Sequence, residues 1–141
     1  MQTFMTSYDY TIVAEQLDYR RLGKQRLEGL KTHNQLTKGK GGFPHHPINA
    51  MWQGFEPSLA EYTNAMINEW IKRGYKNTME LISCCSDWKG YVECNHKKPQ
   101  WVYNDALHRS HKSNLLRKDY LYYSKYYDTN IPTNLPYIWT T

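Results

Sequence analysis

The chain has 141 residues, which suits one domain and leaves little room for a second hydrophobic core. Hydrophobic residues make up 40% and charged residues 22%, which is the composition of a folded globular protein and excludes a disordered one. No apolar stretch approaches the roughly 20 residues that a membrane helix needs, and no basic-then-apolar leader precedes Phe4. We therefore expect an intracellular protein with no membrane partner.

Two features depart from an average composition. The formal net charge is +5, and the chain holds 13 Tyr, five Trp and three Phe. Basic residues neutralise phosphates and flat rings stack on bases, so this combination is typical of nucleic-acid binding. Residues 1–40 hold seven Lys and Arg against four Asp and Glu, residues 97–125 hold seven against two, and the segment between them is mildly acidic. The two basic blocks form either one positive surface for a polyanion or ordinary solvated surface.

The first elements in the chain are predicted to be helical. Asp9 or Thr11 is placed to cap a first helix, and helix-forming residues continue from about Glu15 to Leu36. At 100° per residue, one side of this helix carries apolar residues and the facing arc carries cations with a single carboxylate, Glu28. The apolar side holds Tyr19, Leu22, Leu27 and Leu30, and the facing arc holds Arg20, Arg21, Lys24, Glu28, Lys31 and Gln35.

A solvated helix surface usually mixes charges of both signs, so the cationic arc is a candidate binding or catalytic face. An ion pair between Lys24 and Glu28 is the structural alternative for this arc. Arg26 projects among the apolar positions, where an unpaired guanidinium is costly. Structural pairing and a phosphate contact both remain open for Arg26.

The middle of the chain holds a stiff connection and a core helix. Residues 37–47 are rich in Gly and Pro, and Pro47 suits the first turn of a short helix that contains Trp52. His45 and His46 in this connection act either as capping or surface imidazoles or as substrate contacts. Pro57 opens a helix that runs to Arg73 and stops at Gly74, with apolar residues at i, i+3, i+7 and i+11. We expect no chemistry from this core helix.

The segment after the core helix is less regular. Thr78 is predicted to cap a short helix through Leu81 and Ile82, and residues 86–100 are predicted to form a long irregular loop. Three cysteines and a histidine fall in this region, which are Cys84, Cys85, Cys94 and His96. They lack the paired C-x-x-C spacing of a zinc site, so we predict reduced cysteines, no metal and no cofactor.

The second basic block predicts another helix, from Tyr103 to about Asp119. His108 and His111 share a face with Leu107 and Leu115, which makes them either core histidines with partners or residues that line a site. Cationic residues of this helix point toward solvent or phosphate, and they are Arg109, Lys112, Arg117 and Lys118. Five Tyr follow within residues 120–127, most of which must pack, and residues 132–139 are predicted to lie extended across the body.

The order of these parts resembles the pyrimidine-dimer DNA glycosylase/AP lyase family of bacteriophages and algal viruses, and most of all its bacterial and viral branch. Tyr19-Arg20-Arg21-Leu22-Gly23-Lys24 resembles that family's Tyr-Arg-Glu-Leu-Pro-Arg segment. His46-Pro47 resembles its Ser-Pro turn, and Lys72-Arg73-Gly74-Tyr75 resembles the Lys-Arg-Gly-Phe end of a helix. The resemblance runs over nearly the whole chain.

The resemblance implies a compact all-α domain that binds damaged duplex DNA and kinks it. It also implies cleavage of the glycosidic bond through an imine formed by the N-terminal α-amine, with a helix-borne Glu assisting. Two positions depart from that pattern. The second residue is Gln2 and not a small one, so we expect Met1 to be retained, and its α-amine has an ordinary pKa of about 8. Arg21 stands where the family has the Glu.

The nearest carboxylate on the same helix face is Glu28, roughly 10 Å further along the axis. Either Glu28 has taken over in a rearranged pocket, or the glycosylase chemistry is altered or absent. Excision of a base develops positive charge on the sugar and negative charge on the base, and a carboxylate beside cations or amides suits both. The base must also be extruded from the duplex.

We therefore expect one all-α domain over residues 1–141, a compact helical bundle with long irregular loops and an extended C-terminal tail. The expected function is cleavage of the N-glycosidic bond of a damaged pyrimidine of the UV-dimer type, with AP lyase activity as an open addition. The alternatives are a non-catalytic DNA-binding module on the same fold and a glycosylase for a modified base. The expected partner is double-stranded DNA, bound by a monomer.

The predicted catalytic residues are Glu28, Arg21, Gln25 and Met1. The predicted DNA-binding residues are Arg20, Lys24, Arg26, Lys31, His45, His46, His108, Arg109, His111, Lys112, Arg117 and Lys118.

Overall fold

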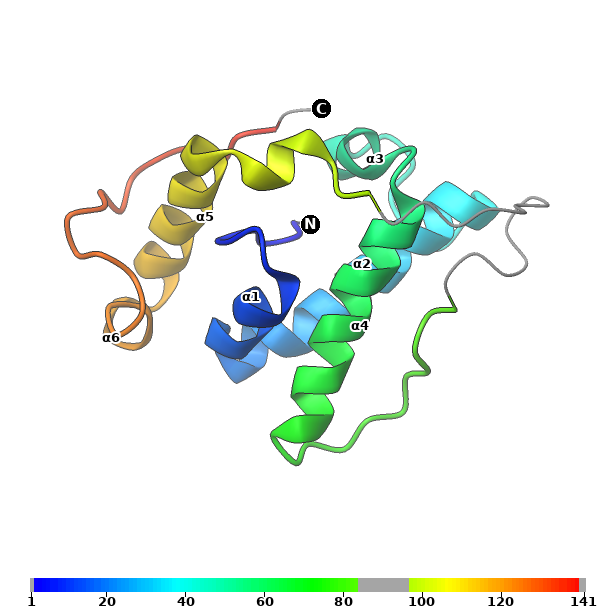
Figure 1. Cartoon of the computed structure of the whole chain (residues 1–141), viewed down its shortest axis with the longest axis horizontal. Coiled ribbons are helices and arrows are strands. Elements are labelled where there is room, and N and C mark those ends of the chain that lie inside the picture. Colours follow the sequence, from blue (N-terminus) through cyan, green and yellow to red (C-terminus); the bar gives the residue numbers. More distant parts are fainter. Residues whose placement is uncertain (1, 84–96, 140–141) are drawn as a thin grey trace.

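The computed structural model describes residues 2–83 and 97–139. Every regular element in these ranges is a helix, as the sequence predicted, and the order is shown in Figure 1. The elements are α1 (Tyr10–Gln16), α2 (Tyr19–Lys38), α3 (Pro47–Trp52), α4 (Glu56–Lys72), the 3-10 helix η1 (Gln100–Tyr103), α5 (Asp105–Lys118) and α6 (Tyr120–Tyr123). No helix in the described part of the chain is long and apolar enough to span a membrane.

Several helix ends follow the predicted signals. Asp9 Oδ1 accepts hydrogen bonds from the N–H groups of Thr11 and Ile12, at 2.9 and 3.3 Å, and so caps α1. The α4 helix has Pro57 in its first turn, and Gly74 follows it with a φ of +87°, a conformation that favours glycine. The predicted helix over residues 15–36 is wrong in its start, because α1 ends at Gln16 and the backbone is extended at the Asp18 N-cap before α2 begins.

The predicted short helix after Thr78 is wrong, since residues 75–83 form no helix. The Asn64 amide on α4 explains the extended path, because it accepts from Ile82 N–H at 2.8 Å and donates to Ile82 O at 3.0 Å. This pairing satisfies both backbone groups without a helical turn. Most of the loop predicted over residues 86–100, with the cysteine and His96 cluster, lies outside the described residues, and Gln100 already begins η1.

The face that α2 turns to the core differs from the predicted one. Leu27 is 46% exposed and Tyr19 is 51% exposed, although both belong to the predicted apolar side. Two glycines decide the orientation, since a Cβ on Gly29 would come within 2.2 Å of Thr63 Oγ1 and one on Gly23 within 3.1 Å of the Trp70 ring. The α2 and α4 helices therefore pack closely along the glycine side of α2. The residues of α2 that this packing buries are Leu22, Gln25, Gly29, Thr32 and His33.

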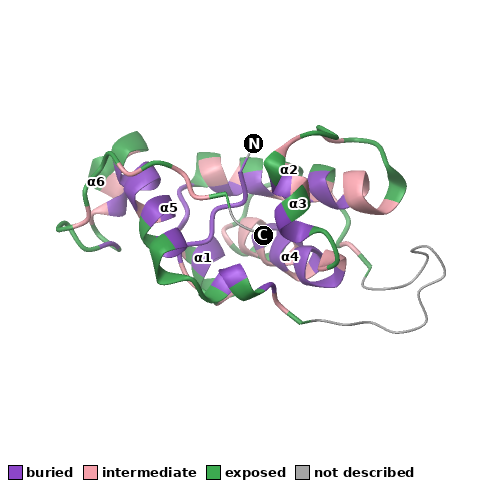
Figure 2. Cartoon of the chain, turned by 90° about the horizontal axis from the view of Figure 1, so that it is seen from above, coloured by how far each residue is buried: buried purple, intermediate pink, exposed green. Residues whose placement is uncertain are grey.

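The N-terminal segment, residues 2–6, is an extended chain in the middle of a helical molecule. It enters between α5 on one side and α2 and α4 on the other (Figure 1), and all five residues are buried (Figure 2). Four consecutive backbone N–H groups donate to side chains. Gln2 N–H donates to Glu28 Oε2 at 3.1 Å, Thr3 N–H to Gln2 Oε1 at 3.0 Å, Phe4 N–H to Gln25 Oε1 at 3.0 Å and Met5 N–H to His111 Nδ1 at 2.7 Å.

Further contacts fix the same segment to the core. Gln25 Nε2 donates to Gln2 O at 2.8 Å, so one amide group pairs with the segment in the way that a neighbouring strand would. The Tyr62 hydroxyl lies 2.8 Å from Phe4 O and 2.6 Å from Gln25 Oε1 and has one hydrogen to share between them. Trp52 Nε1 donates to Thr3 Oγ1 at 3.0 Å. Side chains from α2, α3, α4 and α5 thus meet on five residues.

The C-terminal tail is extended, as predicted, and lies along α5. Leu135 N–H donates to Ser113 Oγ at 3.0 Å, and Ser110 Oγ donates to Pro136 O at 2.6 Å. Asn114 Nδ2 donates to Leu135 O at 3.2 Å. These bonds carry the last described residues, Tyr137 to Trp139, back toward the N-terminal segment.

We expect Gly29→Ala to lower the free energy of unfolding by about 1–2 kcal/mol, because the new methyl group would displace a Thr63 hydroxyl that is already bonded to Leu59 O. Urea denaturation measures this loss. In a Thr63→Ala background, the same substitution should cost much less, since the 2.2 Å contact is gone. An equal loss in both backgrounds would contradict the close packing of α2 on α4.

We also expect the fold to lose stability in mild acid. Burial lowers the pKa of His111 to about 3, and burial with nearby Lys38 lowers the pKa of His33 to about 4. Both values lie below the ordinary 6.5, so from pH 6.5 downward the unfolded chain binds protons that the folded chain does not. The free energy of unfolding should then fall by about 1.4 kcal/mol per pH unit for each histidine.

His111→Asn provides the control for this pH dependence. Asn offers an acceptor for Met5 N–H but does not titrate, so the slope of unfolding free energy against pH should fall by about half. Denaturant titrations between pH 6.5 and 4.5 measure both slopes. An unchanged slope in the variant would mean that His111 does not control the acid response.

Candidate functional site

A cavity of about 370 Å³ lies beside the N-terminal segment. Its walls come from that segment, from α2, from the N-cap of α3, from the end of α5 and from the C-terminal tail. The lining residues are Gln2, Phe4, Arg21, Lys24, Gln25, Glu28, His46, Lys118, Tyr137 and Trp139. Six of these were predicted as site residues from the sequence, and the structure brings those six together.

Among the described residues that line this cavity, Glu28 is the only carboxylate. Its Oε2 atom accepts from Gln2 N–H at 3.1 Å and from Gln25 Nε2 at 2.9 Å. No described residue donates a hydrogen bond to its Oε1 atom, and both bonds from the described residues go to Oε2. The sequence left open an ion pair between Lys24 and Glu28. Lys24 lines the cavity, but within the described part of the chain it forms no ion pair with Glu28.

Gln25 holds this carboxylate in place. The side chain is 1% exposed, and its amide bonds Gln2 O, Glu28 Oε2 and Phe4 N–H. Because both polar atoms of the amide are occupied, Gln25 orients Glu28 against the N-terminal segment and has no group left over for a base. Met1, the predicted nucleophile, lies outside the described residues.

Three cations line the same cavity as Glu28. Arg21 and Lys24 come from α2, as the predicted cationic arc requires, and Lys118 comes from the end of α5. At neutral pH the cavity therefore carries net positive charge around one fixed carboxylate. This arrangement attracts an anionic ligand and can stabilise a positive charge that develops next to Glu28.

His46 serves as a cap and also lines the cavity. Its Nδ1 atom accepts from Ile48 N–H at 3.1 Å at the start of α3, and its ring packs edge-on against Trp139 at 5.4 Å. Partial burial lowers the pKa of His46, which favours the neutral ring. Since Nδ1 is the acceptor, the hydrogen of the neutral ring lies on Nε2 and can be donated to a ligand. The neighbouring His45 is exposed and does not line the cavity.

A basic groove of about 530 Å³ adjoins the cavity. Arg21 and Lys118 line both hollows, so these two side chains lie at the boundary between them. The groove combines four cations with three tyrosines, which is the pattern expected for contact with a phosphate backbone and bases. Its lining residues are Asp18, Tyr19, Arg20, Arg21, Arg73, Tyr75, Lys118, Asp119 and Tyr122.

Arg26 lies elsewhere, in the packing of α2 against α4. Its guanidinium lies over the Trp70 ring at 4.1 Å, and Nη1 donates to Asn77 Oδ1 at 3.0 Å. Of the two alternatives that the sequence left open, the structure supports pairing within the protein. Lys31 is exposed on α2 and does not line the cavity.

The histidines of α5 do not reach Glu28. His111 is fully buried and binds Met5 N–H, and His108 is buried with Nε2 2.6 Å from Val102 O. His108 and Lys112 line a different hollow beside Tyr8. Arg109 and Arg117 are exposed, and Arg117 Nη1 donates to Thr133 O in the tail at 3.0 Å.

Four lining residues were not predicted from the sequence, namely Gln2, Phe4, Tyr137 and Trp139. No local pattern marks them, because they reach the cavity only through the long-range path of the two chain ends. Within the described residues, no group of three or more His, Cys, Asp or Glu is arranged to hold a metal ion.

A carboxylate held beside cations, next to flat rings, is suited to breaking a glycosidic bond in a nucleic acid. The family model for pyrimidine dimer DNA glycosylase matches residues 1–83, which is more than half of the chain. The chain belongs to this family. The match covers Glu28 and its neighbours on α2, whereas Lys118, Tyr137 and Trp139 lie beyond it. No curated protein and no solved structure shows significant similarity to the chain.

We expect Arg26→Ala to lower the free energy of unfolding by about 1–2 kcal/mol through loss of the Trp70 and Asn77 contacts, and to change affinity for duplex DNA less than twofold. Lys24→Ala is the matched control from the cavity side of α2. It should lower the affinity for duplex DNA and leave the free energy of unfolding nearly unchanged. Urea denaturation and fluorescence anisotropy with a labelled duplex measure the two effects. A large loss of DNA affinity in Arg26→Ala would instead assign it a phosphate contact.

Proposed function

We propose that the protein cleaves the N-glycosidic bond of a damaged pyrimidine of the UV-dimer type in double-stranded DNA, acting as a monomer. The observation that carries the proposal is the Glu28 carboxylate, which is bonded to Gln2 N–H and Gln25 inside a cationic cavity. Family membership supplies the substrate class. The residues that line the cavity suggest which groups act on the sugar, the base and the phosphates.

Glu28 acts on the sugar. When the glycosidic bond breaks, its electron pair leaves with the base and positive charge develops at C1′ and the ring oxygen. A carboxylate that is already oriented by two hydrogen bonds stabilises this charge without reorganising. Arg21 and Lys24 stabilise the negative charge of the departing base and of the flanking phosphates, and the Nε2–H of His46 is placed in the same cavity to donate a proton to the base.

The aromatic wall receives the extruded nucleotide. A domain of this size does not enclose a duplex, so the target nucleotide must leave the stack to reach Glu28. Phe4, Tyr137 and Trp139 supply flat rings at the cavity, and stacking on such rings offsets the cost of unstacking in DNA.

We propose AP lyase activity as a second activity of the same site, and this part of the proposal relies on the family resemblance. The α-amine of Met1 attacks C1′, a nitrogen–carbon bond forms, and the glycosidic bond breaks with its electron pair on the base. Glu28 accepts a proton from the amine and returns it to O4′ as the C1′–O4′ bond breaks, which leaves a protonated imine. The ionised Glu28 then removes a proton from C2′, and the electron pair of the C3′–O bond leaves with the 3′ phosphate, which cuts the strand. Support comes from Gln2, since its backbone N–H already binds Glu28 and Met1 is joined directly to it.

A non-catalytic DNA-binding module is the rival, and the position of Glu28 argues against it. A carboxylate in a cationic cavity weakens the attraction of phosphates, and a neutral Gln could accept from Gln2 N–H equally well, so a protein that only binds DNA has no need of the charge. The charge of Glu28 is useful if positive charge develops beside it during a reaction, and this gain offsets the weaker attraction of phosphates. This observation favours an enzyme.

The test is incubation of UV-irradiated duplex DNA with the wild type and with Glu28→Gln. Gln keeps the shape and can still accept from Gln2 N–H, but it carries no charge, so we expect the rate of strand cleavage to fall about 10²- to 10⁴-fold while affinity for the duplex is kept. Glu80→Gln, which changes an exposed carboxylate outside the cavity, is the matched control and should leave the rate unchanged.

Borohydride separates the two chemical routes, because it reduces an imine to a stable amine. A trapped covalent adduct indicates the amine route, and cleavage of the glycosidic bond without an adduct indicates a glycosylase that uses water. An intact-mass measurement of the protein shows whether Met1 is retained. Irradiated duplex that shows neither cleavage of the glycosidic bond nor an adduct would contradict the proposed function.

A further inference from the structure

Asp18 occupies the N-cap of α2, but its side chain makes no capping hydrogen bond. At the N-caps of α1, α5 and α6, the side chains of Asp9, Asn104 and Asp119 all accept from backbone N–H groups of the following turn. Such a bond is the usual reason for an Asp at this position. Asp18 is also buried, with 6% exposed, where an ionised carboxylate needs close partners.

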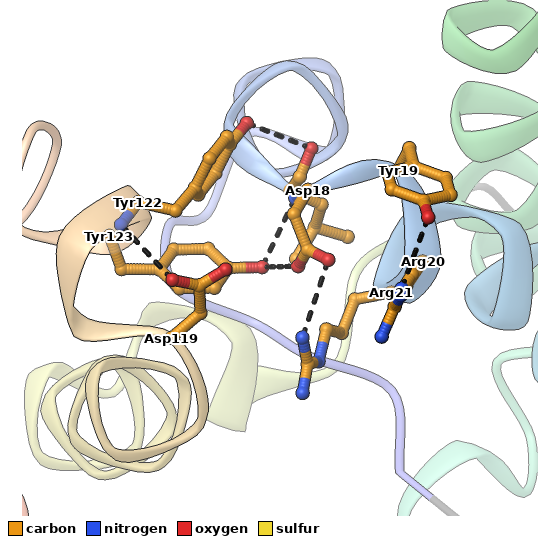
Figure 3. Close-up of polar contacts among 8 residues, drawn as sticks. Asp18, Tyr19, Arg20, Arg21, Asp119, Tyr122 and Tyr123 are labelled. Carbon is orange, nitrogen blue, oxygen red and sulfur yellow. Dashed lines mark hydrogen bonds and ion pairs between the residues drawn. The ribbon is translucent and has the colours of Figure 1, made fainter.

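The Asp18 carboxylate is instead held between Tyr123 and Arg21 (Figure 3). The Tyr123 hydroxyl donates to Asp18 Oδ1 and accepts from Asp18 N–H at 3.1 Å. Burial, together with the hydrogen bond to Asp18, raises the pKa of Tyr123 far above its ordinary value, so the phenol remains a donor. On the other side, Arg21 Nη1 donates to Asp18 Oδ2 at 3.3 Å.

Arg21 lies where the cavity that holds Glu28 meets the basic groove, and it lines both. Its side chain is 26% exposed, and the bond to Asp18 is its one hydrogen bond within the described residues. A guanidinium has five N–H donors in a planar fork, so most of this fork is available at the junction.

We infer that Asp18 and Tyr123 hold Arg21 in position to bind a phosphate of the DNA strand at the junction of the cavity and the groove. The inference rests on the proposed function, because it takes DNA as the ligand. Asp18 and Tyr123 are positioning residues that act through Arg21 and do not touch the substrate. The ligand class is a phosphodiester, since the planar fork of Arg matches two phosphate oxygens.

The arrangement is costly unless the orientation of Arg21 matters. Asp18 gives up the cap of α2 and adds a negative charge to the wall of the basic groove, and both effects are unfavourable for a protein that needs only net charge. A guanidinium fixed before binding loses less conformational freedom when it meets a phosphate. A fixed contact next to Glu28 also sets the register of the strand relative to the carboxylate.

The experiment measures binding of duplex DNA, undamaged and UV-irradiated, over a range of salt concentrations. Asp18→Asn removes a negative charge beside the DNA, so electrostatics alone predicts tighter binding. Positioning predicts the opposite. We expect about tenfold weaker binding and a log–log salt slope smaller by about one, as for Arg21→Gln, with no further loss in the double variant.

Tyr123→Phe should weaken binding in the same direction, and Tyr10→Phe is its matched control. Tyr10 is also a buried tyrosine, with its hydroxyl 2.7 Å from Ser58 Oγ, and it lines neither the cavity nor the groove. The Tyr10→Phe variant should have a lower free energy of unfolding and an unchanged affinity for DNA. Urea denaturation shows that each variant is folded, and if Asp18→Asn does not fold, the comparison of the two phenylalanine variants decides.

Three outcomes overturn the inference alone. Tighter or unchanged binding by Asp18→Asn excludes positioning, and so does a loss that adds fully to that of Arg21→Gln. Equal effects of Tyr123→Phe and Tyr10→Phe would assign Tyr123 to stability alone. In these cases the wild type still binds and cleaves DNA, so the proposed function stands. A wild type that binds no duplex overturns both.

Discussion

The fold depends on the need to satisfy the backbone of one extended segment that crosses the middle of a helical protein. A helix bonds its own backbone and a strand is bonded by its neighbours, but residues 2–5 have neither in the described structure. An unpaired buried amide costs about 1–3 kcal/mol, and the segment presents four N–H groups in succession. Side chains of Glu28, Gln25 and His111, with that of Gln2 itself, take the place of the missing strand.

The same constraint builds the cavity. Gln25 must be buried to bond the segment, and its second amide bond then fixes Glu28. Gln25 therefore serves both the fold and the proposed chemistry, because it bonds the N-terminal segment and also orients the Glu28 carboxylate before any ligand binds. The glycines on α2 also help to build the cavity. They allow α2 to pack closely on α4, and this packing turns Arg21, Lys24 and Glu28 away from the core and toward the cavity.

Features that depend on neighbouring residues could be predicted from the sequence. The helices α1 to α5, the cap at Asp9, the stop at Gly74 and the grouping of Arg21, Lys24 and Glu28 on one face all follow from local spacing, whereas η1 and α6 were not predicted. The buried side of α2 could not, because apolar periodicity favoured Leu27 whereas contact at Gly29 decided the orientation. The helix expected after Thr78 failed for a similar reason, since a distant amide on α4 holds Ile82. Likewise, nothing near Tyr137 or Trp139 in the sequence indicates that they meet His46 and Glu28.

The hydrogen bonds that complete the site join residues that are far apart along the chain. Met5 and His111 are 106 positions apart, and Asp18 and Tyr123 are 105 apart. Contacts of such separation need the largest loops to close and form late in folding. Residues as far as Trp139 must therefore have left the ribosome before the carboxylate, the arginine and the aromatic wall can assemble. The helices can form early, but a newly made copy has no organised cavity until Leu135 and Pro136 have docked along α5.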